Sequence, residues 1–411
     1  MRMQTSSDLA LSAADVAPVQ TVSPRHRVLI LTALSLGGFA IGTSEFATMG
    51  LMPDMVAGFG VSEPQIGHVI SAYALGVVMG APMLAILGGR LPRRMMLLAL
   101  MGFYALGNLA SAWAPDYAAM LVIRFIAGLP HGAFFGVSAL TAVAISKPEA
   151  RGQAVSLTML GLTLAILIGN PLATWMGQVI GWRWAFVMVA VVALATVAML
   201  AWLMPRDRPP PVRSVREELR DFNRLPVWQA LAIGAIGFSG MFCVFSYLAP
   251  TMIHVTGVSR EWIPLGLVGF GVGGVIGNMG GGWLFDRFRF RAAAMVLAWS
   301  ALMLALFPLA AGKLGTLLLS TVAIGMMGGL GVILQTHLMD VAGKAQTLAA
   351  ASHHAAFNAA NALGPWLGGL AISAGWGWTS TGHVGAATAL AGLAIFAWAM
   401  LTLRGRADQA A

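Results

Sequence analysis

The sequence predicts an all-α membrane protein with twelve transmembrane helices in two pseudo-symmetric six-helix bundles. The first observation behind this prediction is composition, because 58% of the 411 residues are hydrophobic, 9% are charged and the mean hydropathy is +0.80. A typical soluble domain carries roughly 25% charged residues, and a fold of this size would not stay dissolved without a charged exterior. The second and third observations are a series of charge-poor runs and an internal repeat.

Twelve charge-poor runs each come close to the roughly 20 residues that a helix needs to cross the hydrocarbon core of a bilayer. They cover residues 28–52, 64–88, 95–113, 117–142, 153–177, 184–204, 227–250, 262–285, 292–311, 314–337, 346–371 and 384–403. These runs are continuously apolar and lack the alternation that the strands of a membrane barrel show. We therefore expect helices, since the backbone polar groups of a helix are satisfied within the span.

Basic residues are concentrated in the segments between alternate spans. With the amino terminus inside, the inner segments hold 20 of the 24 Lys and Arg residues. Such an asymmetry predicts that both termini lie in the cytosol. It gives a cytosolic tail over residues 1–27, a linker over 205–226 and a second tail over 404–411. The basic charge is spread over thin loops, so it does not indicate a nucleic-acid partner.

A tandem repeat divides the chain into two halves, 28–204 and 227–403. Residues 51–66 align with residues 248–263 at an offset of 197, with seven identities in sixteen positions. The same offset aligns four further pairs: Gly76 with Gly273, Gly80 with Gly277, Arg90 with Arg287, and Arg94 with Arg291. Parallel halves of this kind are a transporter architecture, in which the substrate site lies near the membrane midplane between the halves.

Two charged residues stand almost alone in apolar runs. Glu45 is the only formal charge in the first run, and Arg124 is the only one in the fourth. Placing Arg or Asp at the centre of a membrane helix costs about 2.5–3.5 kcal/mol on an insertion scale, so such residues usually face a partner or a pathway. Counting along the helices places Glu45 about 12 Å and Arg124 about 10 Å below their outer ends. The pair is interpreted as a proton- and substrate-sensitive site, or alternatively as a buried ion pair that only ties two helices together.

Polar residues inside other spans are further candidates for this site. His131 lies seven residues after Arg124 and falls on the same helical face. The other cavity candidates are Tyr73, Asn108, Asn358 and Asn361, and Thr158, Ser239, Gln335 and His353 are possible interhelical hydrogen-bonding groups. Asp54 and His68 are expected in a gate or loop near the outer surface. No metal site is expected at His353-His354, because adjacent residues on a helix point about 100° apart.

Several motifs resemble the major facilitator superfamily over essentially the whole chain. The motifs are Gly282-x-x-x-Asp286-Arg287 followed by Arg289 and Arg291, Arg124-x-x-x-Gly128-x-x-x-Gly132, and Gly364-Pro365-x-x-Gly368-Gly369. A looser version of the last motif, the antiporter signature, lies at Gly161, Gly169 and Pro171. Residues 42–46 (GTSEF), residues 128–136 (GLPHGAFFG) and the Trp182-Arg183-Trp184 corner most resemble the arabinose and sugar-efflux permeases, next to the twelve-span drug:proton antiporters.

The resemblance implies a major facilitator fold in which the first and fourth spans line a central cavity, where Glu45 and Arg124 meet. It also implies a cytoplasmic gate formed by the loop residues Arg90, Arg94, Asp286, Arg287 and Arg291. Gly89 stands where the family has Asp, so we expect this gate to depend mainly on the second half. Pro171 and Pro365 are expected to bend spans five and eleven, as hinges or as static kinks. The sequence Gly169-Asn170-Pro171 departs from the antiporter pattern.

The residues and the resemblance together predict a secondary active transporter that exports a small molecule in exchange for protons by alternating access. The substrate would be a sugar, a drug-like compound or a related metabolite. A proton symporter or facilitator that imports a sugar or metabolite is the alternative, and a polytopic membrane enzyme is a third, disfavoured by the scattered acids. No Walker-type loop is present, so the proton gradient, without a cofactor, is the expected energy source. We expect a monomer in the bacterial inner membrane whose partners are the substrate, protons and the lipid bilayer.

Overall fold

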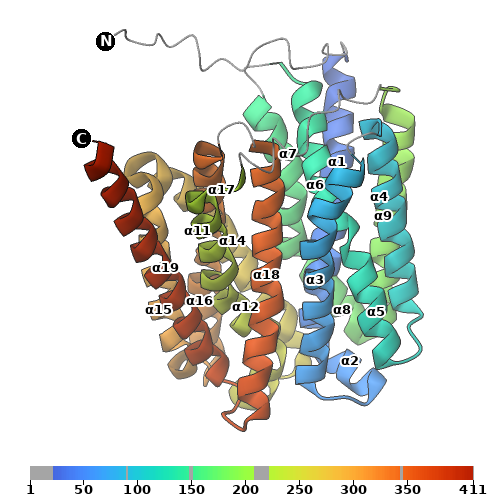
Figure 1. Ribbon diagram of the computed structural model, residues 1–411. Coiled ribbons are helices and arrows are strands. Elements are labelled where there is room, and N and C mark those ends of the chain that lie inside the picture. The colour runs from blue at the N-terminus through green and yellow to red at the C-terminus, as the bar shows by residue number, and fades with distance from the viewer. Residues whose placement is uncertain (1–21, 89–90, 148–150, 208–221, 343–345, 411) are drawn as a thin grey trace.

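The computed structural model is a bundle of long helices (Figure 1). It describes residues 22–88, 91–147, 151–207, 222–342 and 346–410, and in these ranges the chain forms helices and connecting turns without a strand. The first residue of α1 and the last residues of α19 lie at the same end of the bundle (Figure 1). We call this end the terminal side, and the other end the opposite side.

The first bundle contains six membrane-length helical segments within the described residues. They are α1 (Pro24–Gly50), α3 (Glu63–Gly88), α4 (Arg93–Ala112), α5 (Tyr117–Gly128) with α6 (Pro130–Ala144), α7 (Arg151–Leu164) with the π-helical η2 (Ala165–Gly169) and α8 (Asn170–Ile180), and α9 (Trp182–Leu203). The short helix α2 (Met52–Phe59) joins α1 to α3 on the opposite side (Figure 1).

The second bundle repeats this arrangement with six further segments. The first is α11 (Leu225–Ala232), η3 (Ile233–Gly237), α12 (Ser239–Ser246), α13 (Leu248–Thr251) and η4 (Met252–Thr256), and it leads through η5 (Arg260–Trp262) into α14 (Ile263–Phe288). The others are α15 (Ala292–Ala310) after η6 (Arg289–Arg291), α16 (Leu314–Gly325) with η7 (Met326–Gly328) and α17 (Gly329–Val341), α18 (Gln346–Ser373), and α19 (Ser380–Ala410).

The predicted twelve-helix membrane fold is therefore confirmed, with helix ends displaced by up to seven residues (403 against Ala410). Ten segments of the described chain are long and apolar enough to cross a membrane, and the longest, Arg260–Ala310, spans two of the predicted helices. The eleventh predicted span, α18, is not among the ten, because its two histidines and two asparagines lower its hydropathy. Helix α1 begins and α19 ends inside the expected tails, and most of the expected linker lies outside the described residues.

The two halves use the same close helix contact at aligned glycines. A side chain at Gly80 in α3 would collide with the backbone of Leu129, where α5 passes into α6. A side chain at Gly277 in α14, 197 residues later, would collide with the backbone of Met326, where α16 passes into η7. Small residues let membrane helices approach at backbone distance. The repeat read from the sequence is thus a repeat of packing as well.

The helix is interrupted next to Pro171 but is continuous through Pro365. Pro171 follows the π-helical turn η2, which interrupts the α-helical hydrogen-bonding pattern between α7 and α8. Such wide turns are a recognised cause of bends in helices. Pro365 lies inside the continuous helix α18, and its carbonyl accepts a hydrogen bond of 2.8 Å from the Tyr247 hydroxyl.

The buried apolar side chains show where the bundles are joined. One large cluster runs through the second bundle and takes in first-bundle residues that lie toward the opposite side, among them Phe46, Ile66, Ile70 and Phe186. A second cluster, on the terminal side, contains only first-bundle residues, which run from Ile30 to Met204. The described residues therefore form one shared core on the opposite side, while the first bundle keeps a separate core toward the terminal side.

Candidate transport site between the two bundles

The guanidinium of Arg124 is bound by α1 rather than by a carboxylate. It donates from Nη1 to the Ser44 hydroxyl and from Nη2 to the Ser44 carbonyl, each over 2.9 Å. The Ser44 hydroxyl in turn donates to Oδ1 of Asn108 in α4 over 2.6 Å. Arg124 is completely buried, and its Nε has no hydrogen-bond partner. This network joins α1, α4 and α5 at one level of the first bundle.

Aromatic rings complete the surroundings of Arg124 and connect it with His131. The guanidinium lies over the ring of Tyr73, 4.2 Å from its centroid, in a favourable cation–π arrangement. The Tyr73 hydroxyl lies 3.1 Å from Nδ1 of His131 and 3.1 Å from the hydroxyl of Tyr104. Tyr73 therefore brings together two predicted site residues that lie on one face of the fourth span.

The structure places Glu45 against the other bundle. Its Oε1 accepts a hydrogen bond of 3.0 Å from Nδ2 of Asn361 in α18. Glu45 is 5% exposed and Asn361 is fully buried. Among the described residues, no cationic nitrogen lies within 4.0 Å of the Glu45 carboxylate. Arg124 of α5 is thus bonded to Ser44, the residue before Glu45 in α1, but no direct ion pair forms between Glu45 and Arg124.

Phenylalanine rings from both bundles surround this level of the molecule. The ring of Phe46, next to Glu45, lies 6.3 Å from Phe242 and 5.7 Å from Phe245, measured between centroids. Farther toward the terminal side, Phe135 of α6 stacks on His354 of α18 at 5.3 Å. Charges in such a dry environment interact strongly, and an unpaired polar group there is costly.

Most of the other polar candidates form hydrogen bonds with main-chain carbonyls of their own helices. Asn358 donates to the His354 carbonyl one turn earlier, and its Oδ1 is buried without a partner. Thr158 and Ser239 donate to carbonyls three residues earlier in their own helices. His353 packs its ring on Phe357. Gln335 is half-buried in α17. These five residues make no cross-bundle hydrogen bond among the described residues.

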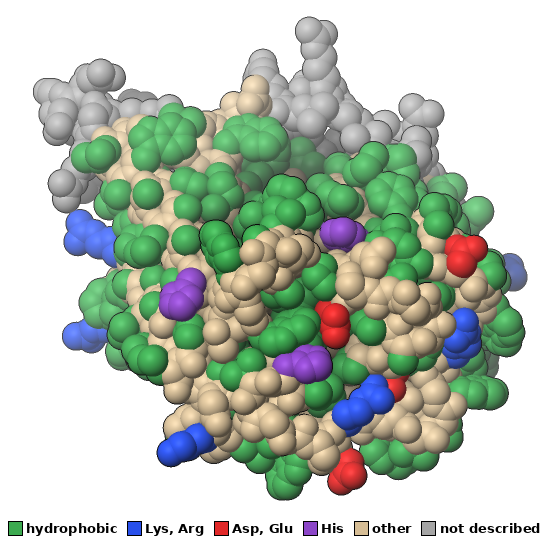
Figure 2. All heavy atoms as spheres, turned by 90° about the horizontal axis from the view of Figure 1, so that it is seen from below, with side chains coloured by type: hydrophobic (Ala, Val, Ile, Leu, Met, Phe, Trp, Pro, Cys, Tyr) green, Lys and Arg blue, Asp and Glu red, His purple; other side chains and the backbone are tan. Residues whose placement is uncertain are grey.

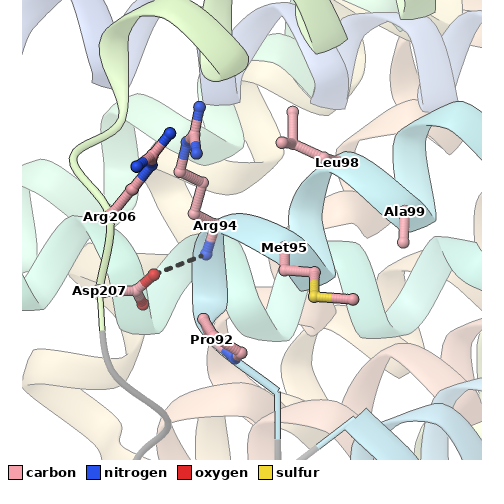
Figure 3. Close-up of a pocket in the computed structure, with 7 residues that line it drawn as sticks. All are labelled: Pro92, Arg94, Met95, Leu98, Ala99, Arg206 and Asp207. Atoms are coloured by element: carbon pink, nitrogen blue, oxygen red, sulfur yellow. Dashed lines mark hydrogen bonds between the residues drawn. The ribbon is translucent and has the colours of Figure 1, made fainter.

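The expected terminal-side loop residues that the structure describes make no hydrogen bond or ion pair with one another. Arg90 lies outside the described residues. The Arg94 side chain donates to the Ala201 carbonyl, and the main-chain amide of Arg93 donates to Asp207 over 2.8 Å. The main-chain amide of Arg94 also donates to Asp207, over 3.3 Å (Figure 3). In the second half, Asp286, Arg287 and Arg291 are exposed, and Asp286 takes part in no hydrogen bond or ion pair within the described part of the chain.

The opposite side carries two acid–base contacts between the bundles. Nη2 of Arg260 lies 2.7 Å from Oδ1 of Asp54, and Nε2 of His254 lies 3.9 Å from Oε1 of Glu63. In both contacts the acid belongs to the first bundle and the base to the second. Figure 2 shows this face, where acidic, basic and histidine side chains lie among apolar ones. His68, the other residue expected here, contacts the Tyr117 hydroxyl at 3.3 Å.

Sequence reasoning missed three contributors to these sites. Ser44 is the direct partner of Arg124, and its signals in the sequence were its position beside Glu45 and its place in the GTSEF motif. Asp207, in the segment after α9, caps the start of α4, which lies more than a hundred residues earlier in the chain. The cross-bundle role of Arg260 depends on how α2 and η5 meet, and an isolated arginine in an outer loop gives no indication of that contact.

Comparisons with known proteins agree with this architecture. Residues 34–294 match the family model described as "Major Facilitator Superfamily". The "Inner membrane transport protein YdhP" of Escherichia coli O157:H7 is 37% identical over 89% of this chain and 94% of its own length. The "Chloramphenicol resistance protein" of Streptomyces lividans is 30% identical over 82% of this chain and 87% of its own length. A bacterial homologue of the human lysosomal transporter Spinster, solved in an inward-facing and occupied conformation, has the same fold, with a TM-score of 0.71 and 17% identity over 93% of this chain and 98% of its own.

Proposed function

Because the chain belongs to the major facilitator superfamily of membrane transporters, we propose that it exports a small molecule in exchange for protons by alternating access. The substrate class is a sugar, a drug-like compound or a related metabolite. The name of the chloramphenicol resistance protein makes a drug-like compound the first class to test. Energy comes from the proton gradient, and the protein works as a monomer without a cofactor.

One observation carries this proposal: Glu45 is a buried carboxyl at the contact between the bundles, with an amide rather than a cation as its partner. An ionisable residue inside a membrane protein is a functional-site hypothesis by default. A carboxyl that is not locked in an ion pair is able to gain and lose a proton as its surroundings change. Alternating access supplies such a change, because the contact between the two bundles must open and close in each cycle.

The proposed orientation puts the terminal side in the cytosol of a bacterial cell. The inner segments, read with the amino terminus inside, hold most of the basic residues, as the positive-inside rule requires. The opposite side, with its shared core and its two acid–base contacts, then faces the periplasm or the exterior. Because these contacts join the two bundles on the opposite side, export through that side requires them to separate during the cycle.

Proteoliposome flux with and without an imposed pH gradient tests the proposal. A panel of sugars and drug-like compounds, beginning with chloramphenicol, is first screened in everted vesicles to find a substrate. Substrate accumulation in the direction opposite to proton flow, which reverses when the gradient is reversed, supports antiport. Substrate accumulation in the same direction as proton flow supports a symporter instead, and flux that does not depend on the gradient supports a facilitator.

The variant Glu45→Gln separates binding from coupling. We expect it to fold and to exchange labelled for unlabelled substrate, but to lose accumulation driven by the pH gradient, because an amide cannot carry the proton. Glu261→Gln is the matched control, since Glu261 is exposed in η5 on the opposite side. Unchanged proton-driven accumulation in Glu45→Gln contradicts the proposed coupling role.

A further inference from the structure

Asn361 is the only described hydrogen-bonding partner of Glu45, and it reaches Glu45 from the other bundle. The two residues are 316 positions apart, and Nδ2 of Asn361 donates to Oε1 of Glu45 over 3.0 Å. One residue farther along α18, the carbonyl of Ala362 accepts a hydrogen bond of 2.7 Å from the Ser71 hydroxyl in α3. The backbone that carries the amide is thus fixed against the first bundle from a second helix.

The other end of the Asn361 amide is free. Its Oδ1 is buried and has no hydrogen-bond partner. Phe46 packs against Phe242 and Phe245 at this level, and a buried polar atom among such rings has little access to water. A buried acceptor left without a donor is costly, and it needs an explanation in a site that is otherwise well packed.

The chemistry of the two groups supplies that explanation. An ionised carboxylate only accepts hydrogen bonds, whereas a carboxylic acid donates one and accepts others. An amide offers both a donor and an acceptor. The N–H of Asn361 therefore matches the ionised form of Glu45, and its unused oxygen matches the O–H of the protonated form. One amide fits both protonation states from the same position.

From this geometry we infer that Asn361 is a positioning residue that binds Glu45 in both protonation states and links the presence of the proton to the contact between the bundles. The ionised form is bound through one N–H···O contact. The protonated form is bound instead through a neutral O–H···O contact to Oδ1 of Asn361. The inference rests on the proposed function, in which Glu45 is the group that gains and loses the proton.

Infrared titration of the purified protein tests this inference without a known substrate. The carbonyl band of a protonated carboxylic acid is followed against pH, and the part that disappears in Glu45→Gln is assigned to Glu45. We expect Asn361→Leu to shift the midpoint of this band to higher pH by up to about one unit, because the charge-assisted hydrogen bond lost from the ionised form is stronger than the neutral one lost from the protonated form. Asn361→Gln keeps both amide functions and is expected to restore the midpoint to within about half a unit.

Thr321→Val is the control for loss of a buried polar group elsewhere in the second bundle. The Thr321 hydroxyl donates to Leu318 in its own helix, and we expect no shift of the Glu45 band in this variant. If Asn361→Leu does not fold, Asn361→Ala is measured in its place and is expected to shift the midpoint in the same direction.

The possible results distinguish the role of Asn361 from the proposed function of Glu45 in proton coupling. A Glu45 band that titrates in the wild type, but with an unmoved midpoint in Asn361→Leu or Asn361→Ala, overturns the role of Asn361 and leaves the proposed function standing. A wild-type protein without any titrating Glu45 band overturns the proposed function itself. A shift in the leucine or alanine variant that the glutamine variant reverses supports the inference.

Discussion

Arg124 binds Ser44 through two atoms of the same residue, the hydroxyl and the main-chain carbonyl, each at 2.9 Å. The planar guanidinium is suited to such a two-pronged contact, and an ammonium is not. Because Ser44 immediately precedes Glu45, the contact fixes the part of α1 from which the Glu45 side chain projects. The positive charge of Arg124 is not in contact with the carboxylate.

We predict that Arg124→Ala reduces transport at least about tenfold and lowers thermal stability in detergent, because the hydroxyl and carbonyl of Ser44 lose the donor that joins them to α5. Hydrogen bonds to charged groups contribute about 1.5–3 kcal/mol each. Arg124→Lys is expected to restore only part of the activity. Flux and thermal unfolding are measured on the same preparations. Arg183→Ala, which removes a carbonyl contact and two cation–π contacts on the opposite side, serves as control. Normal transport by Arg124→Ala would show that the network has no role in the cycle.

We predict that acid on the opposite side favours closure there. Burial raises the pKa of the Asp54 carboxyl, and the attraction of Arg260 offsets only part of that rise. The closed arrangement then binds the proton more readily than an open one in which Asp54 meets water, so linkage favours closure as the pH falls from the raised pKa toward about 4.

Spin labels on exposed positions of the two bundles measure this response. Ala57→Cys in α2 and Glu261→Cys in η5, in a Cys243→Ser background, report the separation across the opposite side. We expect short distances to gain population on acidification. Asp54→Asn imitates the protonated form and should favour closure at neutral pH, whereas Arg260→Ala should favour opening. Distances that do not change with pH in the wild type would contradict the prediction.

We predict that Asp207 stabilises the first-bundle loop, in which Gly89 supplies no carboxylate. Asp207 accepts hydrogen bonds from the amides of Arg93 and Arg94 at the start of α4 (Figure 3). Loss of such a helix cap typically costs about 1 kcal/mol. Asp207→Ala should lower thermal stability by this order, and Asp207→Asn should lower it less. Equal stability of wild type and Asp207→Ala would exclude a capping role.

Asp286→Asn is expected to behave differently. Asp286 is exposed and has no partner among the described residues, so thermal stability should stay within about 0.5 kcal/mol of the wild type, as for most surface changes. Asp286 is proposed to help hold the terminal side closed during one part of the cycle. The variant should therefore slow turnover. Cysteine accessibility on the terminal side measures this effect. Equal accessibility and equal turnover in the two proteins would remove Asp286 from the gate.

We predict that Gly277→Ala destabilises the second bundle, because the added methyl group would meet the backbone of Met326, which cannot move as a side-chain end can. Overpacking of this kind costs about 1–3 kcal/mol. Gly274→Ala in the same helix is the control, since nothing lies near its position. Thermal unfolding compares the two variants. Gly80→Ala should repeat the effect in the first bundle, and equal stability of Gly274→Ala and Gly277→Ala would contradict it.

The fold was predictable because each span is a charge-poor run, and because the repeat at offset 197 aligns glycines whose contacts are equivalent in both halves. The candidate site was only partly predictable. Glu45 and Asn361 were both selected as polar residues in apolar runs, but their contact depends on how two separately folded bundles dock. Hydropathy carries no information about that docking. The expected Glu45–Arg124 ion pair is absent for a local reason, because the guanidinium donates to the Ser44 carbonyl and hydroxyl instead of to the carboxylate.

The distribution of the apolar clusters has a consequence for biosynthesis. The cluster on the terminal side of the first bundle contains residues only from Ile30 to Met204, so every one of its members has been synthesised before the second bundle begins. Domains generally fold in order from the amino terminus as the chain emerges. The shared core, by contrast, needs first-bundle residues such as Phe46 and second-bundle residues such as Phe242 together. Assembly therefore has a built-in order: half of the first bundle matures alone, and its opposite end stays unfinished until the last spans are inserted.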